Sequence, residues 1–339
     1  MAELGAIGRT PYKDRQVGLV LFGILDCLIG LFVLLVAPLP LLALVRSELG
    51  SVLPNLIFDL LLAVAFIWLG IGSILARRWA RTLMLVLSWL WLVSGVAACL
   101  VLLVVHPGPP WPAVLVLAHA IPLGALAFGP AALFVDDTLG DFLALCYVAL
   151  PAILVLFYSS PNVKATCEAR DHRPRWTDRC PTPVLALSLV LDAGAAGILA
   201  AAWYGALPFF GRIVSGPPAV AMDVGLASIL AILGRATFRL RSWAWWRVLA
   251  LALVGDVSIA LAALSGRLSW GEVSGIEMAE QVKRLDYLDT PLEDTRFLVL
   301  LQIFALAGLG YLVWVKRFFR PPAIPRAEAA AGPAPAAGD

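Results

Sequence analysis

Charged residues are scarce in this chain. Asp, Glu, Lys and Arg make up 14% of its 339 residues, against about a quarter in soluble domains. Hydrophobic residues make up 61%, and the mean hydropathy is +0.90. These values exclude an ordinary soluble domain. The net charge of only +2, with no basic patch interleaved with aromatic residues, argues against a nucleic-acid partner.

Catalytic signatures are also lacking. The sequence has no Walker A motif, no G-x-G-x-x-G after a strand, no H-E-x-x-H and no G-x-S-x-G. An enzyme is therefore the less favoured class, and no cofactor is expected. Three of the five cysteines lie in apolar runs, which argues against a disulfide framework. The first residues show no apolar core and no small-residue cleavage site, so we expect no cleaved signal peptide.

Long apolar runs dominate what is present. Many are about 20 residues long, the length that a helix needs to cross the hydrocarbon core of a bilayer. Their continuous Leu, Ala and Val content predicts helices, because barrel strands would give short alternating segments. The runs are 17–45, 55–76, 82–105, 112–134, 142–158, 183–204, 217–236, 248–264 and 297–315.

Basic residues cluster in five connectors, and cytoplasmic loops of membrane proteins are enriched in Lys and Arg. If all five clusters are cytoplasmic, both termini are cytoplasmic and one of the runs 112–134 and 142–158 does not span. The run 112–134 contains Pro122 and Pro130, and proline breaks a helix. We expect eight spans with 112–134 re-entrant or interfacial; nine spans is the alternative. The five clusters are Arg9/Lys13/Arg15, Arg77/Arg78/Arg81, Lys164–Arg179, Arg235–Arg247 and Lys316/Arg317/Arg320.

An internal repeat supports this count. A shift of 164 positions aligns Asp59 with Asp223, Arg77 with Arg241, Trp79 with Trp243 and Ser94 with Ser258. The predicted fold is an all-α polytopic membrane protein of two parallel four-helix repeats. The predicted parts are a first repeat at 1–158, a cytoplasmic linker at 159–182, a second repeat at 183–320 with an outer amphipathic helix at 272–288, and a disordered tail at 321–339.

The linker raises its own question, because "SSPNVKATCEARDHRPRWTDRCP" carries two cysteines and a histidine. The spacing of Cys167, His172 and Cys180 is not a familiar zinc pattern and offers three ligands where structural zinc takes four. A metal site is therefore only a weak alternative. A Cys167–Cys180 disulfide is disfavoured in a reducing cytoplasm, and it becomes the better interpretation if the linker is external. The favoured interpretation is a charged connector at the headgroups.

Two stretches around this linker, "VKATCEARD" and "RWTDRCPTPVLALSL", resemble a block of uncharacterised bacterial multi-pass membrane proteins. The run "GIGSILARRWARTLMLVLSWLWLVSG" is similar in character. This resemblance implies a protein of the bacterial inner membrane, and it implies no activity.

Acidic residues inside apolar runs are the candidate functional residues. A charge at mid-membrane costs about 2.5–3.5 kcal/mol on insertion scales, so such residues often mark ion or proton paths. Hydrogen-bonded packing of a neutral carboxyl is the alternative. The candidates are Asp26, Asp192, Asp256 and His119, with Asp59 and Asp223 as secondary candidates near the ends of their runs.

These features favour a small-solute or ion transporter that uses intramembrane aspartates. A non-catalytic accessory or structural subunit of a membrane complex is the alternative. An intramembrane lipid-modifying enzyme is a third. The expected partners are the lipid bilayer and either another membrane protein or further copies of this chain.

Overall fold

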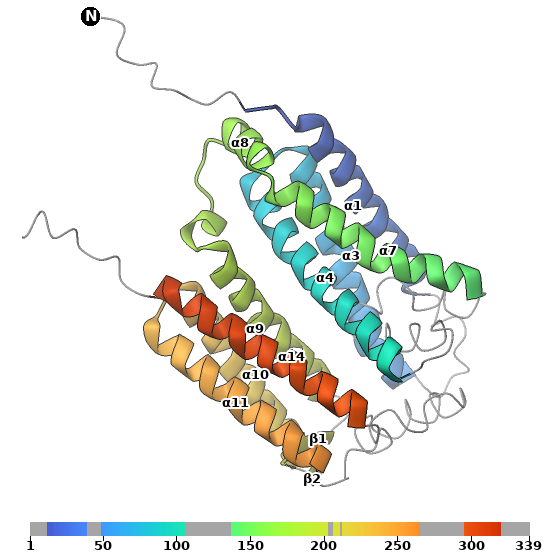
Figure 1. Cartoon of the computed structure of the whole chain (residues 1–339), viewed down its shortest axis with the longest axis vertical. Helices are drawn as coiled ribbons and strands as arrows, with labels where there is room; N and C mark the ends of the chain where they lie inside the picture. Colours follow the sequence, from blue (N-terminus) through green and yellow to red (C-terminus); the bar gives the residue numbers. More distant parts are fainter. Residues whose placement is uncertain are drawn as a thin grey trace, which may run out of the picture.

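The computed structural model describes residues 12–38, 49–105, 137–202, 206–210, 212–264 and 295–319. Several predicted features lie outside these residues: the broken run 112–134 with His119, the outer helix at 272–288 and the tail at 321–339. The described chain is mostly helical, in two groups of helices that lie side by side (Figure 1).

The first group is formed by the N-terminal half of the chain. Its helices are α1 (Gln16–Val36), α3 (Leu49–Ile74), α4 (Arg78–Val105), α7 (Asp137–Ser159) and the short α8 (Pro161–Arg170). The second group follows the 3-10 turn η2 (Trp176–Arg179). Its elements are α9 (Thr182–Ala201), β1 (Ala206–Phe209), β2 (Arg212–Ser215), α10 (Pro217–Phe238), α11 (Ser242–Leu264), α14 (Thr295–Val315) and η4 (Lys316–Phe319).

Several of these helices are long and apolar enough to cross a membrane, as expected of a membrane protein. Within the described residues four meet this test: Gln16–Val36, Arg78–Ala97, Thr182–Ala200 and Pro217–Phe238. A fifth joins them if Val148–Ser159 and Pro161–Arg170, which meet at 61°, count as one bent span. Large apolar side chains on the outer faces are exposed, for example Leu35 and Leu61, which suits contact with lipid.

Each predicted run other than 112–134 overlaps a helix, but the bounds differ. The first run was predicted to reach residue 45, whereas α1 ends at Val36. Pro38 has no N–H to continue the hydrogen-bond ladder. The helix α11 begins at Ser242 rather than 248, because polar and aromatic residues at a helix end lower the hydropathy without interrupting backbone hydrogen bonds.

A short β-hairpin corrects the prediction of an all-α fold. Strands β1 and β2 are antiparallel, with Ala206 opposite Ser215 and Phe209 opposite Arg212. They stand between α9 and α10, in a stretch that the apolar runs left as a connector. The hairpin ends at Gly216, whose φ of 75° is readily adopted by glycine.

Each helix group has its own apolar core. Leu19, Phe66, Met84 and Leu154 are among the buried residues of the first. Val184, Leu185, Leu233, Trp245 and Val315 are among those of the second. Helix α4 joins the groups: its Leu83 packs against both cores, and the helix contacts α9 and α14.

The turns that follow α3 and α10 have the same hydrogen-bond pattern. Ala76 N–H donates to the Ser73 carbonyl at 2.8 Å and Arg77 N–H to the Gly72 carbonyl at 2.9 Å. The corresponding bonds after α10 run from Leu240 N–H to the Thr237 carbonyl at 2.8 Å and from Arg241 N–H to the Ala236 carbonyl at 3.1 Å. Both are Schellman motifs, with Ala76 at φ 49° and Leu240 at φ 55° in the left-handed position that usually holds glycine.

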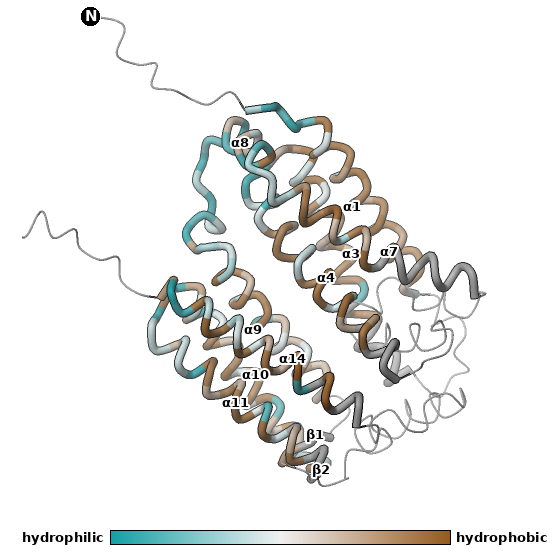
Figure 2. The backbone as a smooth tube through the Cα atoms, in the orientation of Figure 1, coloured by the Kyte–Doolittle hydropathy of each residue, from teal (hydrophilic) through white to brown (hydrophobic). Residues whose placement is uncertain are grey.

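Basic side chains gather at one end of the molecule, which we call the basic end. The linker contacts both helix groups at this end. Arg78 Nη1 of α4 lies 3.9 Å from Asp178 Oδ2, and the Trp176 ring lies 5.9 Å from the Phe238 ring of α10. The start of α1, the turns after α3 and α10, and η4 lie at the same end, which is the most hydrophilic part of the chain (Figure 2). The opposite end, where α4 and α11 finish and α7 and α14 begin, we call the far end.

Candidate functional site

The candidate site is a buried row of hydrogen-bonded polar groups in the first helix group, formed by Asp26, Tyr158 and Ser73, which we call the file. Asp26 is its innermost member. Asp26 lies ten residues into α1, about 15 Å along the helix axis, and its side chain is 0% exposed. The Tyr158 hydroxyl, from the last turn of α7, donates to Asp26 Oδ2 at 3.3 Å. Asp26 Oδ1 has no hydrogen-bond partner among the described residues.

The file continues from Tyr158 toward the basic end. The Ser73 hydroxyl, near the end of α3, shares a hydrogen bond of 2.6 Å with the Tyr158 hydroxyl. Ser73 Oγ also lies 3.3 Å from the Leu19 carbonyl oxygen, so its single proton can be donated either there or to Tyr158. Leu19 precedes Asp26 by about two turns of α1, so the polar groups run from mid-helix toward the basic end. Ser73 and Tyr158 are both buried, and a hydroxyl can donate and accept at the same time.

Tyr158 reaches Asp26 because α7 ends beside it. The chain leaves α7 at Ser159, Ser160 is extended, and Pro161 opens α8 in the first-turn position that suits proline. Phe157, next to Tyr158, packs on Phe22 of α1 with ring centroids 4.4 Å apart. The bend and this aromatic contact fix the end of α7 against α1.

Close packing of α1 on α3 surrounds the acid. A Cβ added at Gly70 would lie 2.6 Å from the Gly23 carbonyl oxygen and 2.6 Å from Cys27 Sγ. A Cβ at Gly30 would lie 2.7 Å from the Ala63 carbonyl oxygen. These glycines let the two backbones approach closely, which is the usual packing of small residues between membrane helices.

Asp192, the counterpart of Asp26 in the predicted repeat, has different surroundings. It lies in α9, where its side chain is exposed on the helix surface, and its carboxylate sits directly over Gly234 of α10. The neighbouring Ser188 hydroxyl donates to the Gly234 carbonyl at 3.0 Å. The structure therefore does not bring Asp192 into a buried file like that of Asp26.

Asp256 has one hydrogen-bond partner among the described residues. Gln302 Nε2 of α14 donates to Asp256 Oδ1 at 2.6 Å, and the pair links α11 to α14 in a half-buried position. Of the secondary candidates, Asp223 is 1% exposed in α10 with Oδ2 unpartnered among the described residues, while Asp59 is half-buried in α3. The other four candidate aspartates each lie on a different helix: Asp59 on α3, Asp192 on α9, Asp223 on α10 and Asp256 on α11.

Cys167, His172 and Cys180 are not gathered into one cluster in the linker. Among the described residues no three His, Cys, Asp or Glu side chains lie close enough together to hold a metal ion. Cys167 and Cys180 are both buried free thiols. Burial raises the pKa of each to about 11.

Asp171 organises the linker instead. Its buried carboxylate accepts hydrogen bonds from Arg175 Nε at 3.2 Å and from the Arg78 backbone N–H at 3.4 Å, and Arg77 Nη1 lies 3.8 Å away. Burial alone would raise the pKa of Asp171, but the Arg175 and Arg78 hydrogen bonds and the charges of Arg175 and Arg77 hold it below its usual value. The linker is thereby attached to the turn after α3.

Sequence reasoning identified Asp26 and missed its partners. A serine and a tyrosine near helix ends carry no signal of their own, and only the meeting of α1, α3 and α7 gives them a role. Gln302 could have been noticed as an amide inside an apolar run, because such groups seek interhelical partners. The chain matches no protein-family model, and no curated protein or solved structure matches it.

Proposed function

We propose that the protein is a proton-coupled transporter of a small solute or ion, and that Asp26 is its proton-binding group. The observation that carries the proposal is the file that runs from Asp26 through Tyr158 and Ser73 to the Leu19 carbonyl, in the direction of the basic end. Intramembrane acids that face a helix-bundle interior commonly mark ion and proton paths.

The chemistry of the file suits proton movement. Tyr158 and Ser73 are hydroxyls joined by a short hydrogen bond, and each can pass a proton by accepting on one side and donating on the other. Asp26 Oδ1 has no partner in the described residues, so this oxygen is available to a proton or a small cation. A buried carboxylate without a full set of partners is costly. This cost favours uptake of a proton by Asp26 over a permanent negative charge.

The proposed topology places this file in a bacterial inner membrane with both termini cytoplasmic. It has eight spans in two parallel four-helix repeats. Two observations support it. The turns after α3 and α10 share one hydrogen-bond pattern at a spacing of 164 residues. The helices α4 and α7 end and begin at the far end (Figure 1), which favours an even number of crossings between them and a run 112–134 that does not span.

Purified protein in liposomes tests the proposal. Pyranine trapped inside reports proton flux when gradients of Na⁺, K⁺ and a panel of sugars, amino acids and carboxylates are imposed in turn. We expect at least one gradient to drive proton flux, Asp26→Asn to abolish it and Tyr158→Phe to reduce it. Asp256→Asn is the matched control, because Asp256 is also intramembrane and hydrogen-bonded but lies outside the file. The proposal fails if no gradient drives flux above that of empty liposomes, or if Asp26→Asn retains it.

The glycine packing favours a second candidate, an accessory subunit of a membrane complex. Contacts at Gly23, Gly30 and Gly70 make α1 and α3 a closely packed pair, and a scaffold with a neutral, hydrogen-bonded Asp26 needs no transport cycle. On this reading Asp26→Asn leaves every flux unchanged, and protein purified in mild detergent carries a stoichiometric partner subunit.

A further inference from the structure

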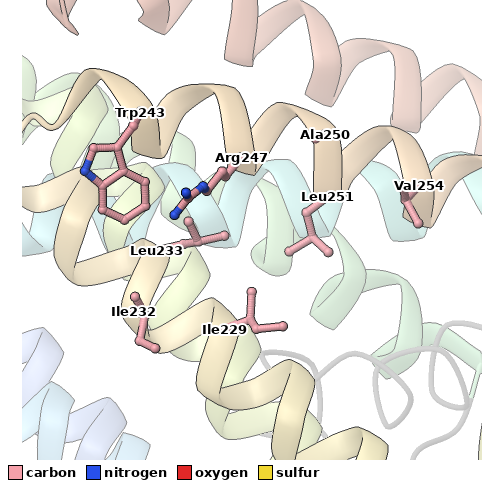
Figure 3. A pocket seen from close by; sticks show the side chains of 8 residues that line it. All are labelled: Ile229, Ile232, Leu233, Trp243, Arg247, Ala250, Leu251 and Val254. Carbon is pink, nitrogen blue, oxygen red and sulfur yellow. The ribbon is translucent and has the colours of Figure 1, made fainter.

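A groove between α10 and α11 lies on the outer face of the second helix group. It is an open groove with a volume of about 470 Å³. Seven of its lining side chains are uncharged, and the eighth is Arg247. Figure 3 shows Trp243, Arg247 and Leu251 pointing from α11 toward Ile229 and Ile232 of α10. Ile229 is 50% and Ile232 62% exposed, so the groove opens outward, where the bilayer lies if the chain is embedded as proposed.

The length of the groove matches one leaflet of a bilayer. Its lining on α11 runs from Trp243, at the basic end, to Val254. That separation is about 16 Å of helix axis, and half of a hydrocarbon core is about 15 Å. The residues at positions 243, 247, 250, 251 and 254 recur at helical spacing, so they form one continuous stripe. An acyl chain of the leaflet on the basic side fits along this stripe.

Arg247 gives the groove a polar head. Its guanidinium carbon lies 4.5 Å from the centre of the Trp243 ring, a cation–π contact that leaves its N–H groups available. No acidic side chain forms an ion pair with Arg247 among the described residues. The exposed Arg239 and Arg241 follow α10 at the same end. A guanidinium in this setting matches a phosphate oxyanion well.

We propose that this groove binds one anionic phospholipid, with an acyl chain along α10 and α11 and its phosphate on Arg247. Basic pockets between membrane helices on the cytoplasmic side are recognised sites for anionic headgroups. The inference requires only that the second group is embedded in a membrane. It does not depend on proton transfer at Asp26, which lies in the other group.

Native mass spectrometry of the detergent-solubilised full chain tests the site with phosphatidylglycerol and phosphatidylcholine as probes. We expect one retained phosphatidylglycerol, bound about tenfold more tightly than phosphatidylcholine, because the choline cation of phosphatidylcholine offsets the charge of its phosphate and repels Arg247, whereas phosphatidylglycerol is a net anion. Arg247→Gln removes this preference. Arg317→Gln is the matched control, because Arg317 also stacks on a tryptophan, Trp314, at 4.2 Å but lies outside the groove.

A second variant tests the acyl-chain part of the site. Ala250 lines the groove, so Ala250→Trp fills it and is expected to weaken binding of both lipids while leaving the circular dichroism unchanged. The proposal is overturned if Arg247→Gln keeps the preference, if Arg317→Gln loses it equally, or if Ala250→Trp binds both lipids as before. It is also overturned if free inorganic phosphate displaces the lipid at equal concentration. Asp26→Asn keeps lipid binding, so this test and the flux test fail independently.

Discussion

Replacing Tyr158 by phenylalanine removes one hydroxyl from the centre of the buried file. That hydroxyl is bonded to Asp26 Oδ2 at 3.3 Å and to Ser73 Oγ at 2.6 Å. All three side chains are 0–1% exposed, so water cannot take its place. Ser73 keeps its bond to the Leu19 carbonyl, whereas Asp26 loses the hydrogen bond that the structure gives it.

The expected loss follows from this asymmetry. A buried polar group left unsatisfied costs about 1–3 kcal/mol. Hydrogen bonds between membrane helices average about 0.6 kcal/mol, with a maximum of about 1.7 kcal/mol. Because the Asp26 carboxyl is left without a partner, we expect Tyr158→Phe to lower the free energy of unfolding by about 1–3 kcal/mol.

Tyr311→Phe is the matched control. Tyr311 occupies the last helix of the second group, and its hydroxyl donates to the Pro183 carbonyl at 2.7 Å. It is 36% exposed, so solvent or headgroups can replace the lost bond, and we expect a loss of about 0.6 kcal/mol or less. Both variants are unfolded reversibly with SDS in mixed micelles, and helicity is followed by far-UV circular dichroism.

A double-mutant cycle with Ser73→Ala isolates the file. Residues in direct contact usually show coupling of about 0.5–3 kcal/mol, and we expect coupling in this range for Tyr158 and Ser73. The reasoning is refuted if Tyr158→Phe costs no more than Tyr311→Phe, or if the losses for Tyr158 and Ser73 simply add.

Three further predictions concern packing, the linker and its thiols. In SDS unfolding, Gly70→Ala should destabilise the protein by about 1–3 kcal/mol, because the added methyl overpacks the contact between α1 and α3. Gly197→Ala should have no such effect, because nothing lies within 4 Å of the new Cβ. Equal effects of the two variants would contradict the close approach of α1 and α3. Asp171→Asn should speed tryptic cleavage of the linker several-fold, and Glu168→Gln, whose pair with Lys164 is exposed, should not. Because the folded pKa of Asp171 is lowered, its contribution to stability is present at neutral pH and is lost as the pH falls below the usual aspartate range. Cleavage of the wild-type linker by an acid-active protease should therefore rise in acid. A cleavage rate that does not change with pH would count against the pairing of Asp171 with its arginines. Cys167, with its pKa raised to about 11, should react with a maleimide at pH 7.5 about a hundredfold more slowly than an ordinary thiol until SDS is added; fast labelling of the folded protein would exclude a buried thiol.

The sequence predicted helix positions well, because length and apolarity are local properties. Each predicted run in the described residues overlaps a helix, and the largest error in a helix end follows from Pro38. The hairpin between α9 and α10 was missed because strands of four residues give too little alternation to detect. The number of membrane crossings and the duplication remain predictions, supported by the two matching turns.

The candidate site was predictable only in part. Asp26 was identified because an acid in an apolar run is costly wherever the helix sits. Asp192 carries the same local signal, yet it lies on the surface of α9 beside Gly234, because exposure depends on which face of a helix its neighbours cover. The charged linker likewise looked like a loose connector, and only the fold brings the buried Asp171 against Arg175 and the turn at Arg77 and Arg78.

By itself, the sequence determined that this is a helical protein with segments suited to a membrane, that its basic residues fall in connectors and that few acids enter the apolar runs. These follow from the composition and order of neighbouring residues. The tertiary structure alone decided which acid has partners, since Asp26, Ser73 and Tyr158 come from three helices and are as many as 132 positions apart. It also decided that Arg247 lines an apolar groove, because a groove exists only between two packed helices.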